Sequence, residues 1–153
     1  MLESLATVLG GLITAAQAMA YFDMSLKGRR GDARALIAEL KENSRLCFHV
    51  AGGGVKASRV IPQFSTVEFD RLNKAGFNFN VLKRSKIPEF SGLARTDLAS
   101  WSGKKTEHLV ANIYDKIKNL RSIHAFQPES TGQRRRLLNV HKRILLLLRH
   151  AGA

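Results

Sequence analysis

The sequence predicts an all-α protein, a small helical bundle of three or four main helices with a hydrophobic N-terminal helix and an irregular, aromatic-rich middle segment. Two observations support this fold class: apolar residues recur at spacings of three and four over long stretches, and no stretch has a convincing hairpin pattern. With 153 residues, of which 44% are hydrophobic and 24% charged, the chain has an ordinary globular composition. We divide it into a hydrophobic helix, residues 1–26, and one basic helical-bundle domain, residues 27–153.

The first predicted helix covers residues 4–22, which contain no charged side chain. These 19 residues are just long enough to cross the hydrocarbon core of a bilayer. Basic residues follow at Lys27, Arg29 and Arg30, the order typical of a signal anchor whose basic flank stays in the cytoplasm. No positive charge precedes the apolar run, so a secretory signal peptide is not predicted. Two interpretations stay open: an anchor in the inner membrane, or a helix buried in the bundle.

The two faces of this segment differ in side-chain size. Its apolar face, which would contact lipid, comprises Leu5, Val8, Leu9, Leu12, Ile13 and Met19. The opposite face carries Gly10, Thr14 and Ala18 at four-residue spacing. In a membrane this pattern lets two helices approach closely, so a homo-oligomer formed through this face is one predicted assembly.

The second predicted helix covers residues 33–50. The glycines and arginines of Gly28–Gly31 predict a break before it, and Asp32 is a suitable N-cap. The triple glycine Gly52–Gly54 predicts its end. Its apolar stripe consists of Leu36, Ile37, Leu40, Cys47 and Val50. Because Cys47 lies on this stripe, we interpret it as a core thiol rather than a nucleophile, and a single cysteine also excludes an internal disulfide.

Residues 55–103 are the least regular part of the chain. Ser65 and Glu68 have the spacing of a capping box, and Ala75–Gly76 is a stop, so a short helix is predicted over 66–75. Residues 77–80 alternate like a strand but are interpreted as a loop or the start of another short helix. Six aromatic residues concentrate here: Phe64, Phe69, Phe77, Phe79, Phe90 and Trp101. Basic residues interleave them, as in a base-stacking platform, but we favour the interpretation that they form the core of the bundle.

Two further helices are predicted at the C-terminal side. The first runs from about Thr106 to His124, with the apolar stripe Leu109, Val110, Ile113, Ile117 and Leu120. The last follows Pro128, with Ser130 and Gln133 as a cap. Its apolar residues form two adjacent rows, Leu137, Val140, Ile144 and Leu147 beside Leu138, His141, Leu145 and Leu148. A helix apolar over so wide an arc is buried on two sides.

The charge of the chain predicts an anionic partner. The formal net charge is +13, and the segment from Ser130 onward has no acidic residue. The predicted anion-binding residues are Lys27, Arg29, Arg30, Arg134, Arg135, Arg136, Lys142 and Arg143. A surplus of this size attracts nucleic acid or an anionic lipid surface, and a protein partner is the other interpretation.

Candidate catalytic residues are few. No spacing typical of a metal site is present, and no cofactor is predicted. Arg136 and His141, five residues apart on the last helix, resemble the arginine and histidine of the HEPN family of helical-bundle ribonucleases. That resemblance implies metal-free RNA cleavage, with the histidine as acid–base and the arginine stabilising phosphate charge. The chain departs from the family where a polar residue usually follows the arginine, because Leu137 stands there. Arg143 and His150 repeat the pairing at seven residues, but we expect His150 to lie in a frayed C-terminus.

Two functional hypotheses follow. The first is a non-enzymatic, membrane-anchored cytoplasmic interaction module that docks on anionic lipid or on a protein. The second is a soluble nucleic-acid-binding bundle, with the HEPN-like nuclease as its enzymatic version.

Overall fold

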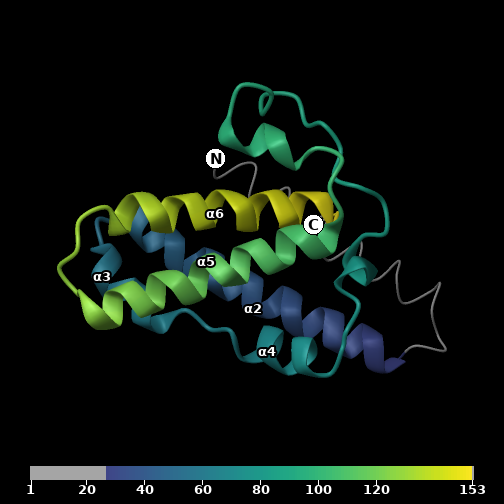
Figure 1. Cartoon of the computed structure of the whole chain (residues 1–153), viewed down its shortest axis with the longest axis horizontal. Helices are drawn as coiled ribbons and strands as arrows, with labels where there is room; N and C mark the ends of the chain where they lie inside the picture. The colour runs from purple at the N-terminus through teal and green to yellow at the C-terminus, as the bar shows by residue number, and fades with distance from the viewer. Residues whose placement is uncertain (1–26, 153) are drawn as a thin grey trace.

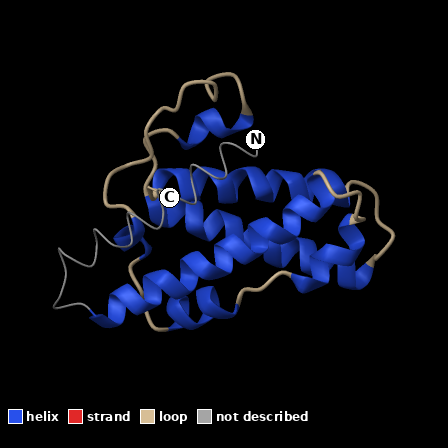
Figure 2. Ribbon diagram, turned by 180° about the vertical axis from the view of Figure 1, so that it is seen from behind, coloured by secondary structure: helices blue, strands red, loops and turns tan. Residues whose placement is uncertain are grey.

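The computed structural model describes residues 27–152, which form an all-helical bundle (Figure 1). The three long helices are α2 (Lys27–Ala51), α5 (Thr106–Phe126) and α6 (Gln133–His150). Short elements connect them: α3 (Ala57–Val60), η2 (Ile61–Gln63), α4 (Val67–Lys74), η3 (Phe79–Leu82) and η4 (Asp97–Trp101). No strand occurs between residues 27 and 152 (Figure 2), so the predicted fold class is confirmed.

The predicted N-terminal helix lies outside the described residues. This applies to its apolar face and to the small face with Gly10, Thr14 and Ala18. Within residues 27–152, no helix combines the length and apolar character needed to cross a membrane.

Helix α6 is the centre of the bundle. It packs against both α5 and α2 and runs antiparallel to each of them (Figures 1 and 2). Both of its predicted apolar rows contribute to the core, since Leu137, Ile144 and Leu148 are buried. The prediction that this helix is buried on two sides is confirmed.

The start of α2 differs from the prediction. No break occurs at Gly28–Gly31: the helix begins at Lys27, and Asp32 lies inside it rather than at its N-cap. The Asp32 carboxylate instead accepts a hydrogen bond from Arg71 of α4 at 3.0 Å. Each of the two glycines costs a helix only about 1 kcal/mol, so glycine alone need not end it.

The end of α2 is as predicted. The helix stops at Ala51, and the amide of Val55 donates to the carbonyl of His49 at 3.0 Å. A Cβ at Gly53 would lie 2.7 Å from that same carbonyl oxygen, and Gly54 has a φ of +70°. The turn therefore requires glycine for close approach at one position and for its backbone conformation at the next.

Helix α4 confirms the short helix predicted over 66–75, and its C-terminal end is a Schellman motif. The amide of Phe77 donates to the carbonyl of Leu72 at 3.0 Å, and that of Gly76 donates to the carbonyl of Asn73 at 3.2 Å. Gly76 takes the left-handed conformation, with a φ of +74°.

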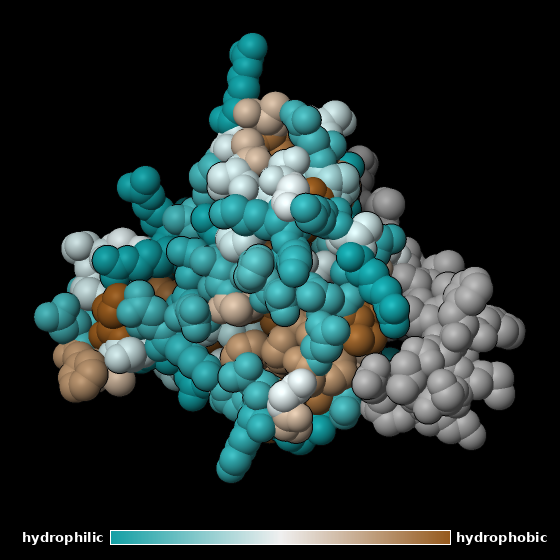
Figure 3. Space-filling model, turned by 45° about the vertical axis from the view of Figure 1, so that its right-hand side comes forward, coloured by the Kyte–Doolittle hydropathy of each residue, from teal (hydrophilic) through white to brown (hydrophobic). Residues whose placement is uncertain are grey.

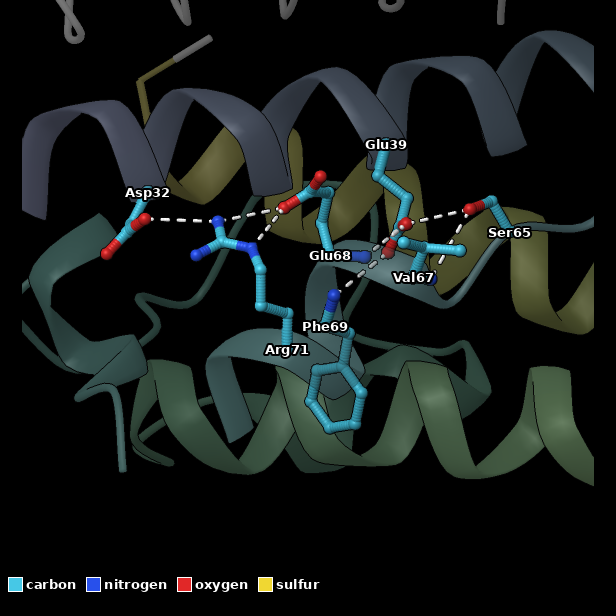
Figure 4. A network of polar contacts seen from close by, with 7 residues as sticks. All are labelled: Asp32, Glu39, Ser65, Val67, Glu68, Phe69 and Arg71. Atoms are coloured by element: carbon cyan, nitrogen blue, oxygen red, sulfur yellow. Dashed lines mark hydrogen bonds and ion pairs between the residues drawn. The ribbon is translucent and has the colours of Figure 1, made fainter. Parts of the chain in front are cut away.

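The N-terminus of α4 is capped from another helix, so the predicted capping box of Ser65 and Glu68 is wrong. Figure 4 shows the Glu39 side chain of α2 pointing at the first turn of α4. Its carboxylate accepts from the amide of Glu68 at 2.8 Å, the amide of Phe69 at 3.2 Å and the hydroxyl of Ser65 at 2.8 Å. The Glu68 side chain, which would close a capping box, pairs with Arg71 instead.

Asn43, one turn after Glu39 on α2, holds the same segment. Its amide group donates to the carbonyl of Ser65 at 2.8 Å, and its oxygen accepts from the Ser65 amide at 3.0 Å. Glu39 and Asn43 are both buried. Burial together with the Glu39 charge raises the pKa of Tyr114 on α5 well above its ordinary value, so the tyrosine stays neutral.

The aromatic residues of the middle segment form core, as favoured above. Phe69 stacks on Tyr114 at 4.2 Å and on Phe79 at 5.3 Å between ring centroids. Phe64 and Trp101 are also buried, while Phe77 and Phe90 pack partly buried against the same core. Rings buried in this way cannot stack on bases. Residues 79–82 form the 3-10 helix η3, so of the two interpretations of residues 77–80, a loop or the start of a short helix, the structure shows the second.

The beginning of α6 also differs from the prediction. Gly132, with a φ of +82°, occupies the N-cap, where no side chain forms a cap hydrogen bond. Gln133 is buried and donates to Ser130 Oγ and the Pro128 carbonyl, both at 3.0 Å. Ser130 and Gln133 therefore do not cap α6. The Gln133 side chain is buried, and it binds Ser130 and the preceding loop.

The Glu39 network predicts a large stability effect at one acidic residue of α2. Replacing Glu39→Ala removes the acceptor for two backbone amides and a hydroxyl, and should lower the free energy of unfolding by about 3 kcal/mol. The matched control is Glu42→Ala on the same helix, whose solvent-exposed pair with Arg45 should contribute little to stability. Urea unfolding followed by circular dichroism measures both. Equal losses in the two variants would contradict the capping role.

Candidate functional site

The structure does not bring Arg136 and His141 together. Arg136 is exposed, whereas His141 is 2% exposed and lies in the interior between α6 and α2. Positions five apart on an α-helix are separated by about 140° around its axis. The His141 ring nitrogen Nε2 lies 3.2 Å from Ser44 Oγ, and Phe48 packs edge-on against the ring at 4.5 Å. The pair that the HEPN resemblance requires is therefore absent from this surface.

Arg143 and His150, the second arginine–histidine pair, also contact other residues of the protein. His150 is buried rather than frayed, so that prediction is wrong: its Nε2 lies 2.9 Å from Thr106 Oγ1 at the start of α5. Arg143 pairs with Asp97 at 3.5 Å and donates to the Asn139 carbonyl at 3.0 Å. The two side chains therefore have separate partners.

Both buried histidines are neutral near pH 7. Burial lowers the pKa of His141 to about 4. Burial and the nearby charge of Lys83 also lower the pKa of His150. These imidazoles connect α6 to α2 and to α5 rather than facing a substrate. Cys47 is a fully buried core thiol, as predicted, and burial raises its pKa to about 12.

The described part of the chain has a larger net positive charge than the whole chain. Residues 27–152 hold all 25 lysines and arginines and ten of the 12 acids, a formal net charge of +15. Five of those ten acids form ion pairs with lysine or arginine: Asp32, Glu42, Glu68, Asp70 and Asp97. Most of the cationic side chains have no such partner within residues 30–152.

Five exposed basic residues gather where α5 begins, and we call them the basic end: Lys83, Arg84, Lys86, Lys104 and Lys105. Main-chain hydrogen bonds bring the two segments together. The amide of Ile87 donates to the carbonyl of Lys104 at 2.9 Å, and that of Gly103 donates to the carbonyl of Ile87 at 2.8 Å. The Thr106 hydroxyl adds a third bond, to the carbonyl of Lys83 at 2.7 Å. None of the five cations forms an ion pair with a carboxylate of residues 30–152.

The basic end lies at the end of the bundle where α2 starts and α6 finishes (Figure 1). Figure 3 turns this end toward the viewer, where long hydrophilic side chains cover most of the described surface. Trp101 sits beside it, with the Lys104 ammonium 4.8 Å from the centre of its ring. Lys83, Arg84 and Lys86 form a cluster visible in the sequence. Lys104 and Lys105 join them only through the main-chain pairing, which no sequence spacing indicates.

A second basic feature lies between α5 and α6, and we call it the α5–α6 groove. It is a hollow of about 160 Å³ lined by Lys116, Asn119, Leu120, Arg136, Asn139 and Val140. One cation from each helix lines it, and no carboxylate does. Of these residues only Arg136 is among the predicted anion-binding positions. The sequence gives no signal that Lys116 and Asn119 of α5 line the same hollow as Arg136 and Asn139 of α6.

The remaining predicted anion-binding residues are spread over the molecule. Arg134, Arg135 and Lys142 are exposed on α6, and Arg30 is half-buried on α2. Nothing is described of the Lys27 and Arg29 side chains. The predicted set therefore does not form one site.

Among residues 27–152, no group of three or more histidine, cysteine or acidic side chains could hold a metal ion. Comparisons with protein-family models, curated proteins and solved structures find no match.

The buried imidazole of His141 predicts a pH-dependent stability. His141 has its ordinary pKa of about 6.5 in the unfolded chain and a pKa of about 4 in the folded protein. The free energy of unfolding therefore has its full value above about pH 6.5 and decreases as the pH falls from about 6.5 to about 4. The His141 contribution to that loss should be about 3 kcal/mol.

Urea unfolding at about pH 7 and about pH 4.5 measures this effect. The variant His141→Gln should show a smaller loss between the two conditions, while His108→Gln, at an exposed position, should keep the wild-type loss. The same pH dependence in all three proteins would contradict the assignment to His141.

Proposed function

We propose that this chain is a non-enzymatic interaction module that docks on the anionic cytoplasmic leaflet of the inner membrane. Residues 4–22 are its anchor, and the basic end is the surface that contacts lipid headgroups. The observation that carries the proposal is the collection of five exposed cations at the end of the bundle where α2 begins, none of them paired with a carboxylate of residues 30–152. Because the anchor segment directly precedes α2, this end is the one that the connection holds closest to the membrane.

The charge of the basic end is sufficient for such docking. Each lysine or arginine near an anionic leaflet contributes about 1 kcal/mol, and this attraction decays within a Debye length of about 8 Å. Only cations gathered on one surface can therefore act together. The main-chain bonds between Ile87, Gly103 and Lys104 hold the two basic segments next to each other before the membrane is reached.

The anchor and the basic end would both contribute to membrane binding. A membrane segment keeps the bundle close to the leaflet. The basic end then meets lipid headgroups at a high effective concentration, so even weak contacts with headgroups lead to binding. The basic flank at Lys27, Arg29 and Arg30 favours the cytoplasmic side for the bundle. The face with Gly10, Thr14 and Ala18 would let two copies associate within the membrane.

Docking predicts a change at the single tryptophan. The full chain, reconstituted into vesicles that contain brominated lipids, should show stronger quenching of Trp101 fluorescence when anionic lipid is included, because Trp101 lies beside Lys104. Added salt should reduce this difference. Equal quenching in anionic and zwitterionic vesicles would contradict docking by charge.

Two variants with the same loss of charge locate the contact. The triple variant Lys83→Gln, Arg84→Gln, Lys86→Gln should lose most of the anionic-lipid effect. The triple variant Arg134→Gln, Arg135→Gln, Arg136→Gln, at the opposite end of α6, should keep it. Similar losses in both would show that net charge, rather than the basic end, determines docking. An effect abolished by added nucleic acid would favour the nucleic-acid interpretation instead.

The anchor is tested separately by fractionation. After cell lysis and a carbonate wash, the intact chain should stay with the membranes and be released by detergent, because 19 uncharged residues interact with the hydrocarbon core. Replacing Leu9→Arg and Ile13→Arg should move the chain to the soluble fraction, whereas a double lysine-to-arginine change at Lys104 and Lys105 should not. Recovery of the wild-type chain without detergent would contradict anchoring.

A further inference from the structure

The α5–α6 groove is separate from the basic end. Arg136 lies in the first turn of α6, whereas the basic end surrounds the last turn of the same helix, near His150. Most of the length of α6 therefore separates the two features. The docking role proposed for the basic end does not use the groove.

The groove has the chemistry of a site for a small oxyanion. Lys116 supplies a point charge and Arg136 a planar guanidinium, and neither forms an ion pair with a carboxylate of residues 30–152. Asn119 and Asn139 add side-chain amide donors, one from each helix. Leu120 and Val140 complete the lining, which contains no competing acid.

Charges around the groove also favour an anion. Three consecutive arginines, Arg134, Arg135 and Arg136, occupy the first turn of α6, where the positive end of the helix dipole is unfavourable for cations. Arg143, whose guanidinium binds the Asn139 carbonyl, has a buried Nε without a hydrogen-bond partner in the described part of the chain. Asp97 neutralises part of the Arg143 charge at 3.5 Å but does not line the groove. Arg143 itself does not line the groove and is paired with Asp97, so a bound anion would offset the repulsion among the three arginines of the first turn.

We propose that the α5–α6 groove binds one phosphate group, with Arg136 and Lys116 as the charged contacts and Asn119 and Asn139 as amide donors. A hollow of about 160 Å³ accommodates a phosphate with a few water molecules, and its two cations and two amides suit phosphate oxygens rather than the face of a base. Recognition is therefore of the phosphate rather than of a base. The phosphate can come from a free ion, a nucleotide or a nucleic-acid strand, and the rest of a larger ligand lies outside the groove.

The test uses the full chain and three probes: inorganic phosphate, a nucleoside monophosphate and a single-stranded oligoribonucleotide. Calorimetry and the NMR signals of the asparagine side-chain amides report binding. We expect Arg136→Gln and Lys116→Gln each to weaken binding about tenfold, as expected for loss of one charge-assisted contact. The matched control is Arg135→Gln, which changes the exposed arginine directly before Arg136 on α6. This variant should weaken binding less than about threefold.

The outcomes separate the sources of phosphate and the two proposals. Binding of all three probes at comparable strength supports recognition of a single phosphate, whereas much tighter binding of the oligoribonucleotide with competition from inorganic phosphate identifies a nucleic-acid strand. The variant Lys83→Gln, Arg84→Gln, Lys86→Gln should retain phosphate binding, so a failure of membrane docking leaves this result unaffected. Equal weakening by Arg136→Gln and Arg135→Gln, or no binding of any probe, would overturn the site.

Discussion

The carboxylate of Glu39 is the contact that organises the middle of this protein. It lies buried between α2 and α4, where it accepts two backbone amides of the first turn of α4 and the hydroxyl of Ser65. A buried carboxylate is costly unless its oxygens are satisfied, and the positive end of a short helix satisfies them. The bond in turn orders a helix of eight residues that would not be stable alone.

The position of α4 determines much of the surrounding packing. Once its first turn is fixed, Phe69 lies between Tyr114 and Phe79, and Arg71 reaches Asp32 on α2. On the other side of α4, Asp70 pairs with Lys118 of α5. The irregular segment after α4 is then held by its aromatic residues and by the main-chain hydrogen bonds that join Ile87 to Gly103 and Lys104. Its basic residues consequently have defined positions, although they lie outside long helices.

The buried histidines hold the helix that carries basic residues at its start. His141 and His150 stay neutral and bind Ser44 and Thr106, which fixes α6 against α2 and α5. Helix α6 can then present basic residues at its start while its interior face is apolar. The basic end adjoins its other terminus, where Thr106 contacts both His150 and the Lys83 carbonyl. The positive charge of the protein is thus divided between two features with different geometry, an open end and a narrow groove.

The sequence by itself determined the fold class, the extents of most helices and the identity of the core, because apolar spacing along a helix is a local property. The stripe of α5 from Leu109 to Leu120 and the stop at Gly52–Gly54 are examples. It could not determine the cap of α4 or the continuation of α2 through Gly28–Gly31, since both depend on residues of another helix. Likewise, Lys104 joins Lys83 at the basic end, and Lys116 faces Arg136 across the groove, only after the chain has folded. The tertiary structure decided these features because charges separated by about 20 residues act together only when backbone pairing or helix packing places them side by side.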